Sequence, residues 1–226
     1  PDGHTLLLYH VGMATSPSLY RNLPYKTLDD FEYLGMINDV PMTLIGRSTL
    51  PANNYAELVK WLEANKGKIN LANAGLGAAS HLCGLLFQQA MKTDMTTVPY
   101  KGTAEQMIAV ASGQVMVGVN STGFAPYVDN GQLRLLATFG ERRSGRWPQV
   151  PTLKELGYGI VAMSPYGLAG PAGMHADVVR VLHDALKAAM HEPAHIAELA
   201  RYDQELAYLG PEDYGRSMRA TFAAER

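Results

Sequence analysis

The chain has 226 residues, of which 47% are hydrophobic and 18% charged, and its formal net charge is −2. This composition is ordinary for a globular protein, and the small net charge gives no support for binding to nucleic acid or to an anionic membrane. No run approaches the roughly 20 apolar residues that a membrane helix needs. The single cysteine, Cys83, excludes an internal disulfide framework and a cysteine-based zinc site.

The first two thirds of the chain alternate between short apolar runs and helical patterns. Strand-like runs occupy residues 5–10, 41–46, 115–120 and 133–139, with weaker candidates at 68–74 and 95–100. Helical patterns lie between them, at residues 53–65, 80–92 and 102–112. Several strand-like runs are continuously apolar, as in strands of a parallel sheet that are buried on both faces. The alternation predicts an α/β fold.

The last third of the chain is mainly helical. The patterns predict helices at residues 175–192, 192–202 and 210–226. Residues 150–159 are predicted to form a short helix that begins with Thr152 as its N-cap and ends at Gly157. The segment 140–151, "GERRSGRWPQVP", is the one stretch with the composition of a linker.

The loop "GLGAAS", residues 75–80, has the chemistry of an anion-binding turn. Its small residues leave backbone N–H groups accessible, and the following helix directs its dipole at the loop, with Ser80 as its N-cap or first-turn hydroxyl. The loop is close to the dinucleotide fingerprint, but that motif requires an acid after the second strand. Asp94 lies before the strand at 95–100 instead. A phosphate, a carboxylate or a plain turn all stay open at this point.

Two further strand ends carry polar residues. Lys101 follows the strand at 95–100, and Asn120, Ser121 and Thr122 end the strand at 115–120. Because open α/β sheets bind ligands at the carboxyl ends of their strands, these residues are candidates for the same site. Lys101 could equally cover a surface.

The segment "HEPAH", residues 191–195, matches a zinc-binding pattern literally. That pattern needs both histidines on one face of an uninterrupted helix. Pro193 would break such a helix and fits better as the first residue of a new one. We therefore expect no metal site, and we expect His191 and His195 at the surface of a helix junction. No arrangement typical of a nucleophilic enzyme is present in the sequence.

Several longer stretches make the chain similar to a known family. "AGLGAASHLCGLLF" and "VPYKGTAEQMIAVASGQVMVGVNS" resemble the solute-binding proteins of tripartite tricarboxylate transporters, the Bug family. "PDGHTLLL", "GQLRLLATFGERRSGRWPQVPTLKELGY" and "GLAGPAGMHADVVRVLHDAL" agree with the same family in the same order. The resemblance covers essentially all 226 residues.

The resemblance implies a two-lobed periplasmic binding protein of the type II-like α/β class. Each lobe would be a mainly parallel sheet flanked by helices, and two hinge crossings, near 37–41 and 137–143, would join the lobes. Lobe 1 would then comprise residues 1–40 and 141–226, and lobe 2 residues 41–140. The lobes would close on a ligand because its contacts favour the closed state.

The resemblance also implies the function. The protein would be a monomeric binding protein without enzymatic activity or cofactor, located in the periplasm. Its ligand would be a small mono- or dicarboxylate, aliphatic or aromatic, and its partners the permease subunits in the membrane, with no nucleic acid. The alternative from the residues is a nucleotide-dependent α/β enzyme that uses the Gly75–Ser80 loop for phosphate.

By position, the family's carboxylate site falls on the same loop. Its contacts would be mainly the backbone N–H groups of Leu76, Gly77, Ala78, Ala79 and Ser80, with His81 beginning the helix. From lobe 1, the loop 9–20 would supply His10, Ala14 and Thr15. Tyr166 stands where relatives commonly carry tryptophan, and Asn120, Ser121 and Thr122 would line the floor of lobe 2. In the family, a further strand and helix with a Pro-Gly-Gly loop come before "PDG". We expect that this segment and a signal peptide are not part of the given sequence.

Overall fold

The computed structural model describes residues 1–224 and divides into two compact units. Unit 1 comprises Pro1–Asp39, Ser164–Ala200 and Gln204–Arg226, and unit 2 comprises Val40–Met163 and Arg201–Asp203. Residues 225–226, the end of the predicted lobe 1 and of its last helix, lie outside the described residues.

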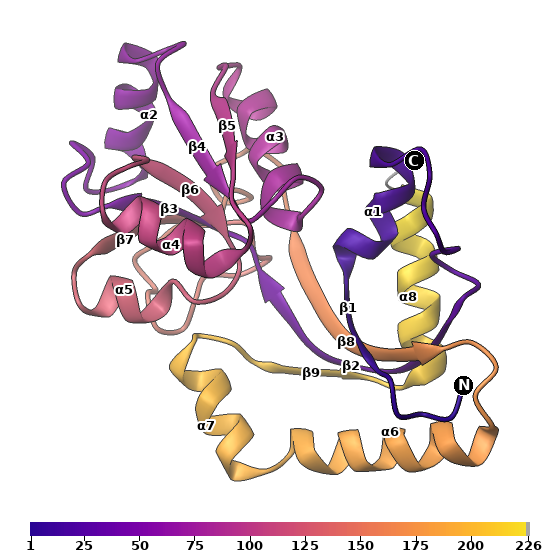
Figure 1. The fold of residues 1–226 in the computed structure, drawn as a ribbon. Coiled ribbons are helices and arrows are strands. Elements are labelled where there is room, and N and C mark those ends of the chain that lie inside the picture. The colour runs from indigo at the N-terminus through magenta and orange to yellow at the C-terminus, as the bar shows by residue number, and fades with distance from the viewer. Residues whose placement is uncertain (225–226) are drawn as a thin grey trace. The chain divides into compact units, whose positions relative to one another are not determined.

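Unit 2 is built on a five-stranded sheet with the order β5-β4-β6-β3-β7 (Figure 1). β4 (Asn70–Asn73) runs parallel to both β5 (Thr96–Pro99) and β6 (Val117–Asn120). β3 (Thr43–Arg47) is antiparallel to β6 and to β7 (Leu133–Thr138). The sheet is therefore mixed, and its parallel part contains the strands that precede the candidate loops.

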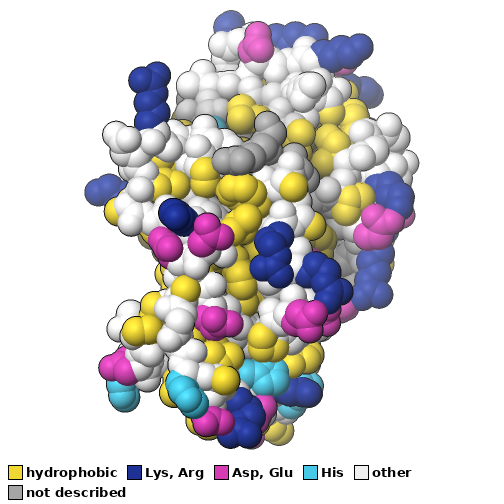
Figure 2. Space-filling model, turned by 90° about the vertical axis from the view of Figure 1, so that its right-hand side faces the viewer, with side chains coloured by type: hydrophobic (Ala, Val, Ile, Leu, Met, Phe, Trp, Pro, Cys, Tyr) yellow, Lys and Arg dark blue, Asp and Glu magenta, His cyan; other side chains and the backbone are white. Residues whose placement is uncertain are grey.

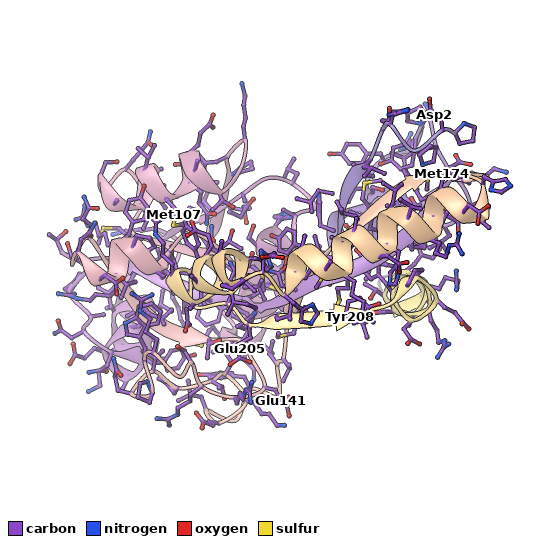
Figure 3. All side chains as sticks on the ribbon, turned by 90° about the horizontal axis from the view of Figure 1, so that it is seen from below. Asp2, Met107, Glu141, Met174, Glu205 and Tyr208 are labelled. Atoms are coloured by element: carbon purple, nitrogen blue, oxygen red, sulfur yellow. The ribbon has the colours of Figure 1, made fainter. Side chains whose placement is uncertain are left out.

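Helices cover both faces of this sheet. Successive strand residues point to opposite sides, and apolar residues occur on both. On one face, α2 (Tyr55–Ala64) and α3 (Ala79–Met91) share an apolar cluster with Leu44 and Leu71. On the other face, α4 (Thr103–Ala111) and α5 (Ala125–Asp129) share a cluster with Ile45 and Ala72. Met107 of α4, labelled in Figure 3, belongs to the second cluster. The predicted alternation of strands and helices is confirmed in this unit.

The segment 140–163 packs onto unit 2 and is not a linker. Trp147, Val150 and Leu153 are buried in its two apolar clusters. The amide of Thr138 donates to the carbonyl of Pro151 at 3.0 Å, and Thr152 forms a parallel β-bridge with Thr138 at the end of β7. The second passage between the units consequently lies at residues 163–164, later than the predicted crossing at 137–143, and unit 2 extends beyond residue 140.

The predicted short helix at 150–159 is a hydrogen-bonded turn. Thr152 Oγ1 accepts the amide of Glu155 at 3.0 Å, and the Glu155 carboxylate accepts the amide of Thr152 at 3.0 Å. This reciprocal pair is the capping box of a helix N-terminus. Gly157 adopts φ +86°, where it ends the turn before a full helix forms.

Unit 1 contains a four-stranded sheet with the order β1-β8-β2-β9. β1 (Leu7–His10) is antiparallel to β8 (Met163–Pro171), and β2 (Phe31–Pro41) is antiparallel to β9 (Leu206–Leu209). These pairings differ from the mainly parallel sheet that was predicted for lobe 1. β1 also lies at an edge of the sheet, where Leu8 is 53% exposed, and not at its centre.

Four helices accompany this sheet: α1 (Val11–Leu19), α6 (Ala176–Met190), α7 (Pro193–Arg201) and α8 (Pro211–Ala224). α1 occupies the segment 9–20 that was predicted to be a loop. α7 begins at Pro193, as predicted, so the "HEPAH" segment is a junction between two helices. His191 is exposed there, and its Nδ1 lies 2.7 Å from the carbonyl oxygen of Lys187.

Aromatic side chains fill the core of unit 1. Tyr9, Tyr33 and Tyr214 meet edge to face, with ring centroids 5.3–6.4 Å apart. The Tyr214 hydroxyl donates to the carbonyl of Tyr9 at 3.1 Å, which ties α8 to β1. Tyr208 of β9, labelled in Figure 3, lies with its hydroxyl 2.6 Å from His183 Nε2 on α6. Hydrophobic side chains also reach the surface between charged groups (Figure 2).

Candidate functional site

Three loops of unit 2 meet at the carboxyl ends of β4, β5 and β6. The amide of Tyr100 donates to the carbonyl of Asn73 at 3.0 Å, which joins the ends of β5 and β4. A Cβ atom on Gly75 would lie 3.3 Å from the Tyr100 carbonyl oxygen. A Cβ atom on Gly123 would lie 3.3 Å from Thr103 Cγ2, so the loop after β6 also adjoins the start of α4. The structure thus brings together the loops that carry Ser80, Lys101 and Thr122.

Side chains hold the loop between β4 and α3 in a defined shape. Asn73 Oδ1 accepts the amide of Gly75 at 2.9 Å, and Ser80 Oγ accepts the amide of Ala74 at 3.0 Å. His81 Nδ1 accepts the amide of Gly77 at 3.3 Å. Gly77 has φ +76°, a conformation that residues with a side chain rarely adopt. We call Asn73, Ser80 and His81 the loop anchors.

The start of α3 is left open for an anion. Among residues 1–224, the amides of Ala79 and Ser80, the first two residues of the helix, donate no hydrogen bond. Ala78 is the N-cap and supplies no side-chain bond, and within this described part of the chain the first turn carries no acid. Two unpaired donors and the positive end of the helix dipole therefore face the loop.

The neighbouring helices α2 and α4 each carry an acid in the first turn, although α4, like α3, has no side-chain cap. Asn54 caps α2 by accepting the amide of Glu57 at 3.0 Å, and Glu57 is an acid in the first turn. α4 carries Glu105 in its first turn, and the Glu105 carboxylate accepts the amide of Lys101 at 3.2 Å. The helix start at α3 is consequently the better place for an external anion.

Ser80 is the second residue of α3 and not its N-cap, so the first-turn alternative is confirmed. The side chain is only 4% exposed, and its oxygen receives the Ala74 amide. Its side chain therefore holds the loop, whereas its backbone amide is one of the two unpaired donors. Leu76, by contrast, is 62% exposed at the tip of the loop.

One ring nitrogen of His81, Nδ1, makes a hydrogen bond within the loop. Because Nδ1 accepts the Gly77 amide, the neutral ring carries its proton on Nε2. Burial lowers the pKa of His81, which favours this neutral form. Lys101 is exposed at the neighbouring loop, where its backbone amide, and not its ammonium group, makes the bond to Glu105.

The predicted floor residues separate into two groups. Asn120 is 1% exposed, and its amide nitrogen donates to Gln106 Oε1 at 2.7 Å. Its oxygen accepts the amide of Thr122 at 2.7 Å, so the Asn120 side chain positions the loop. Ser121 is also buried, whereas Thr122 is half-buried. Sequence reasoning missed Gln106, although a glutamine on the apolar side of the helix pattern at 102–112 was a usable signal.

The candidates of unit 1 lie at the start of α1. His10 is its N-cap: Nδ1 accepts the amide of Gly12 at 3.1 Å, and burial lowers the pKa of the ring. His10 pairs with Tyr166 across β1 and β8, with ring centroids 6.4 Å apart. Ala14 and Thr15 are buried within the helix, and Thr15 Oγ1 donates to the Gly12 carbonyl. The structure therefore groups His10 with Tyr166 and buries Ala14 and Thr15 within α1.

Comparison with known proteins identifies the family. The model of the Tripartite tricarboxylate transporter family receptor matches residues 1–225. The chain belongs to this family. A curated relative from Cupriavidus necator, the UPF0065 protein in gbd 5'region, is 39% identical over 100% of this chain. A relative from Agrobacterium vitis is 36% identical over 88% of it. The chain spans 67% and 58% of the lengths of these two relatives.

Solved structures of the family share the fold. The periplasmic binding protein BugD is 34% identical, with a TM-score of 0.95 over 100% of this chain and 77% of its own. A protein of R. palustris, solved with adipate, is 26% identical, with a TM-score of 0.93 over 99% of this chain and 76% of its own. MatC from Rhodopseudomonas palustris, solved with bound malate, is 25% identical, with a TM-score of 0.88 over 100% of this chain and 79% of its own.

Three further features of the described residues concern the dinucleotide motif, metal binding and membrane spans. Asp94, the acid nearest to the position of the dinucleotide fingerprint, is exposed and precedes β5. Residues 1–224 contain no group of three or more His, Cys, Asp or Glu side chains placed to hold a metal ion. Within the same residues, every helix is too short or too polar to cross a bilayer.

Proposed function

We propose that the protein is a periplasmic solute-binding receptor that takes up a small carboxylate at the start of α3. It would act as a monomer, without catalysis or cofactor, and pass its ligand to the permease subunits of a tripartite tricarboxylate-type transporter. Membership of the receptor family supports the general role, and the site supports the chemistry of the ligand.

One observation carries this proposal: the two unpaired amides of Ala79 and Ser80 at an uncapped helix start without an acid. A carboxylate can accept both N–H groups with its two oxygens, and the helix dipole favours its charge. Leu76, Gly77 and Ala78 would border the bound group, and Thr122 and Lys101 would approach it from the adjoining loops. His10 and Tyr166 are our candidates for contacts from unit 1.

The relatives narrow the class of ligand that we propose. Adipate and malate, the acids found with two solved relatives, are both small aliphatic dicarboxylates. The amides of α3 would contact a single carboxylate group and would not select between ligands by the rest of their structure. We therefore propose the class of small carboxylic acids, with dicarboxylates as the first to test.

The test removes one donor without removing the helix. In Ala79→Pro, the proline occupies the first helical position, where its ring fits the helix and its missing N–H would otherwise be unpaired. Ala78 has ψ 156°, which suits a residue before proline. The matched control is Ala176→Pro at the first position of α6, where His175 has ψ 140°. Both variants should fold, and only Ala79→Pro should bind acids more weakly.

Isothermal titration calorimetry with adipate and malate measures the effect. A hydrogen bond to a charged group contributes about 1.5–3 kcal/mol, so Ala79→Pro should lower the affinity about 10- to 100-fold. Equal affinity in Ala79→Pro and the unaltered protein would place the ligand elsewhere. Stabilisation by ATP or NAD, with no response to carboxylates, would favour the nucleotide-dependent enzyme instead.

A further inference from the structure

We propose that His81 is a positioning residue of the carboxylate site, which holds the Gly75–Ala78 loop in its binding shape only while its imidazole is neutral. This inference rests on the proposed function and adds a regulation of the same site by pH. The His81 side chain bonds to the loop, and it directly follows the two unpaired donors in sequence.

The geometry of the loop gives His81 this role. Its Nδ1 accepts the amide of Gly77 at 3.3 Å, and its own amide donates to the carbonyl of Ala78 at 2.9 Å. His81 therefore holds both the middle and the end of the loop. The unpaired donors, Ala79 and Ser80, are the two residues that separate His81 from the loop in sequence. A change in the His81 ring thus acts directly on the backbone that presents them.

Protonation would remove the bond to Gly77. The imidazolium ring carries a hydrogen on Nδ1, which would face the N–H of Gly77 as a second donor. Two donors cannot share a hydrogen bond, so the ring or the loop has to move. Asn73 and Ser80 would keep the first half of the loop in place, but the half that leads into α3 would lose the bond from Gly77 to His81.

The surroundings of His81 keep the ring neutral near neutral pH. Burial lowers its pKa, and it is the cause of this shift. The charged residues next along the chain are Lys101 of the adjoining loop and Glu105 in the first turn of α4, whose carboxylate accepts the Lys101 backbone amide. The opposing effect is the attraction between an imidazolium and the bound carboxylate. Water screens that attraction because the His81 ring is only half-buried.

Two substitutions of His81 distinguish the loss of the hydrogen bond to Gly77 from the loss of the titratable ring. His81→Asn supplies an oxygen that can accept the Gly77 amide and does not titrate, whereas His81→Leu removes the acceptor. The matched control is His175, whose Nδ1 also accepts a backbone amide at 3.3 Å, that of Asp177, at the start of α6. His175→Asn and His175→Leu thus delete the same kind of bond away from the site.

Calorimetry with adipate at about pH 7.5 and about pH 5 provides the binding data. At the higher pH we expect about tenfold weaker binding in His81→Leu and nearly unchanged binding in His81→Asn and in both His175 variants, because one loop anchor is lost only in the first. Acidification should weaken the unaltered protein about fivefold more than His81→Asn. The protonation of adipate itself affects all variants alike and cancels in this comparison.

A measurement without ligand separates the inference from the function. ¹⁵N nuclear magnetic resonance of the free protein should show a His81 ring protonated on Nε2, and the Gly77 amide signal should move as His81 titrates. Coincident pH profiles for the unaltered protein and His81→Asn, or full binding by His81→Leu, would overturn the inference while the function stands. Absence of binding by the unaltered protein to every carboxylate would overturn the function and, with it, the role of His81.

Discussion

Replacing Gln106 by methionine should destabilise unit 2 by about 3 kcal/mol. Gln106 is fully buried, and its Nε2 donates to the carbonyls of Ala72 at 2.9 Å and Val119 at 2.7 Å. Its Oε1 accepts the side-chain amide of Asn120 at 2.7 Å. Methionine has a similar shape but makes none of these bonds, and each is worth about 1 kcal/mol net, more where a buried group is left unpaired.

Urea denaturation followed by tryptophan fluorescence measures the loss in the free energy of unfolding of unit 2. The chain has two tryptophans, Trp61 and Trp147, and both belong to unit 2. The transition of Gln106→Met should move to lower urea with an unchanged slope, because the surface exposed on unfolding is the same.

A double-mutant cycle with Asn120→Ala tests the reasoning more strictly. The single change should cost about 2 kcal/mol, since it orphans Gln106 Oε1 and the amide of Thr122. The double variant should cost about 1 kcal/mol less than the sum of the two single variants, because the bond between the side chains is lost only once. A loss below about 1 kcal/mol for Gln106→Met, or strict additivity, would refute the account of a coupled buried network.

Two predictions concern unit 1. Burial raises the pKa of Asp39 from 3.8 to about 6, so the folded protein binds this proton more tightly than the unfolded chain and loses stability as pH rises between these values. Asp39→Asn should therefore raise the free energy of unfolding by about 2 kcal/mol at about pH 7.5, a value reduced for partial exposure, and leave it unchanged below about pH 4; thermal melts that gain equally at both pH values would contradict this. A Cβ on Gly167 would lie 2.5 Å from the Gly35 carbonyl oxygen and 2.4 Å from the Tyr214 ring, so Gly167→Ala should cost about 3 kcal/mol or more. Urea denaturation followed by far-UV circular dichroism, to which the helices of both units contribute, measures this loss, with Gly145→Ala, where nothing lies within 4 Å, as the control.

The elements of unit 2 follow from local sequence. Apolar runs and helical spacing place β3, β4, β6 and β7 and helices α2 to α4 within a few residues of their observed bounds. The loop proposed to bind the carboxylate is equally local, since its glycines and its anchors lie within nine residues, from Asn73 to His81. The resemblance adds the family and the expected ligand chemistry, which a turn of small residues alone leaves open.

Contacts between distant segments explain what the sequence did not predict. The passage at 163–164 depends on the amide of Ala162 meeting the carbonyl of Phe139 at 2.9 Å and on the bridge from Thr138 to Thr152. The sheet of lobe 1 was predicted to be mainly parallel, yet the partner of β1 is β8, about 160 residues later and antiparallel. No local period encodes such a pairing.

Helix α1 shows a different limit. The resemblance implied a loop at residues 9–20, and the local sequence gives little sign of a helix, because Pro17 lies inside it and its apolar residues do not follow a clear helical stripe. The His10 cap and the contacts with α8 stabilise the helix in the fold. Ala14 and Thr15 are consequently buried within a helix, where the resemblance implied a loop.

The loop anchors separate two parts of molecular recognition that many binding sites combine. The loop is ordered when the protein folds, so binding of an acid does not have to immobilise it, and the entropy lost on capture is mainly that of the ligand. The donors are backbone amides, which survive nearly every substitution of Leu76, Ala78 or Ala79. A receptor built in this way can acquire a new ligand through changes in the surrounding side chains while the means of holding its carboxylate stays constant.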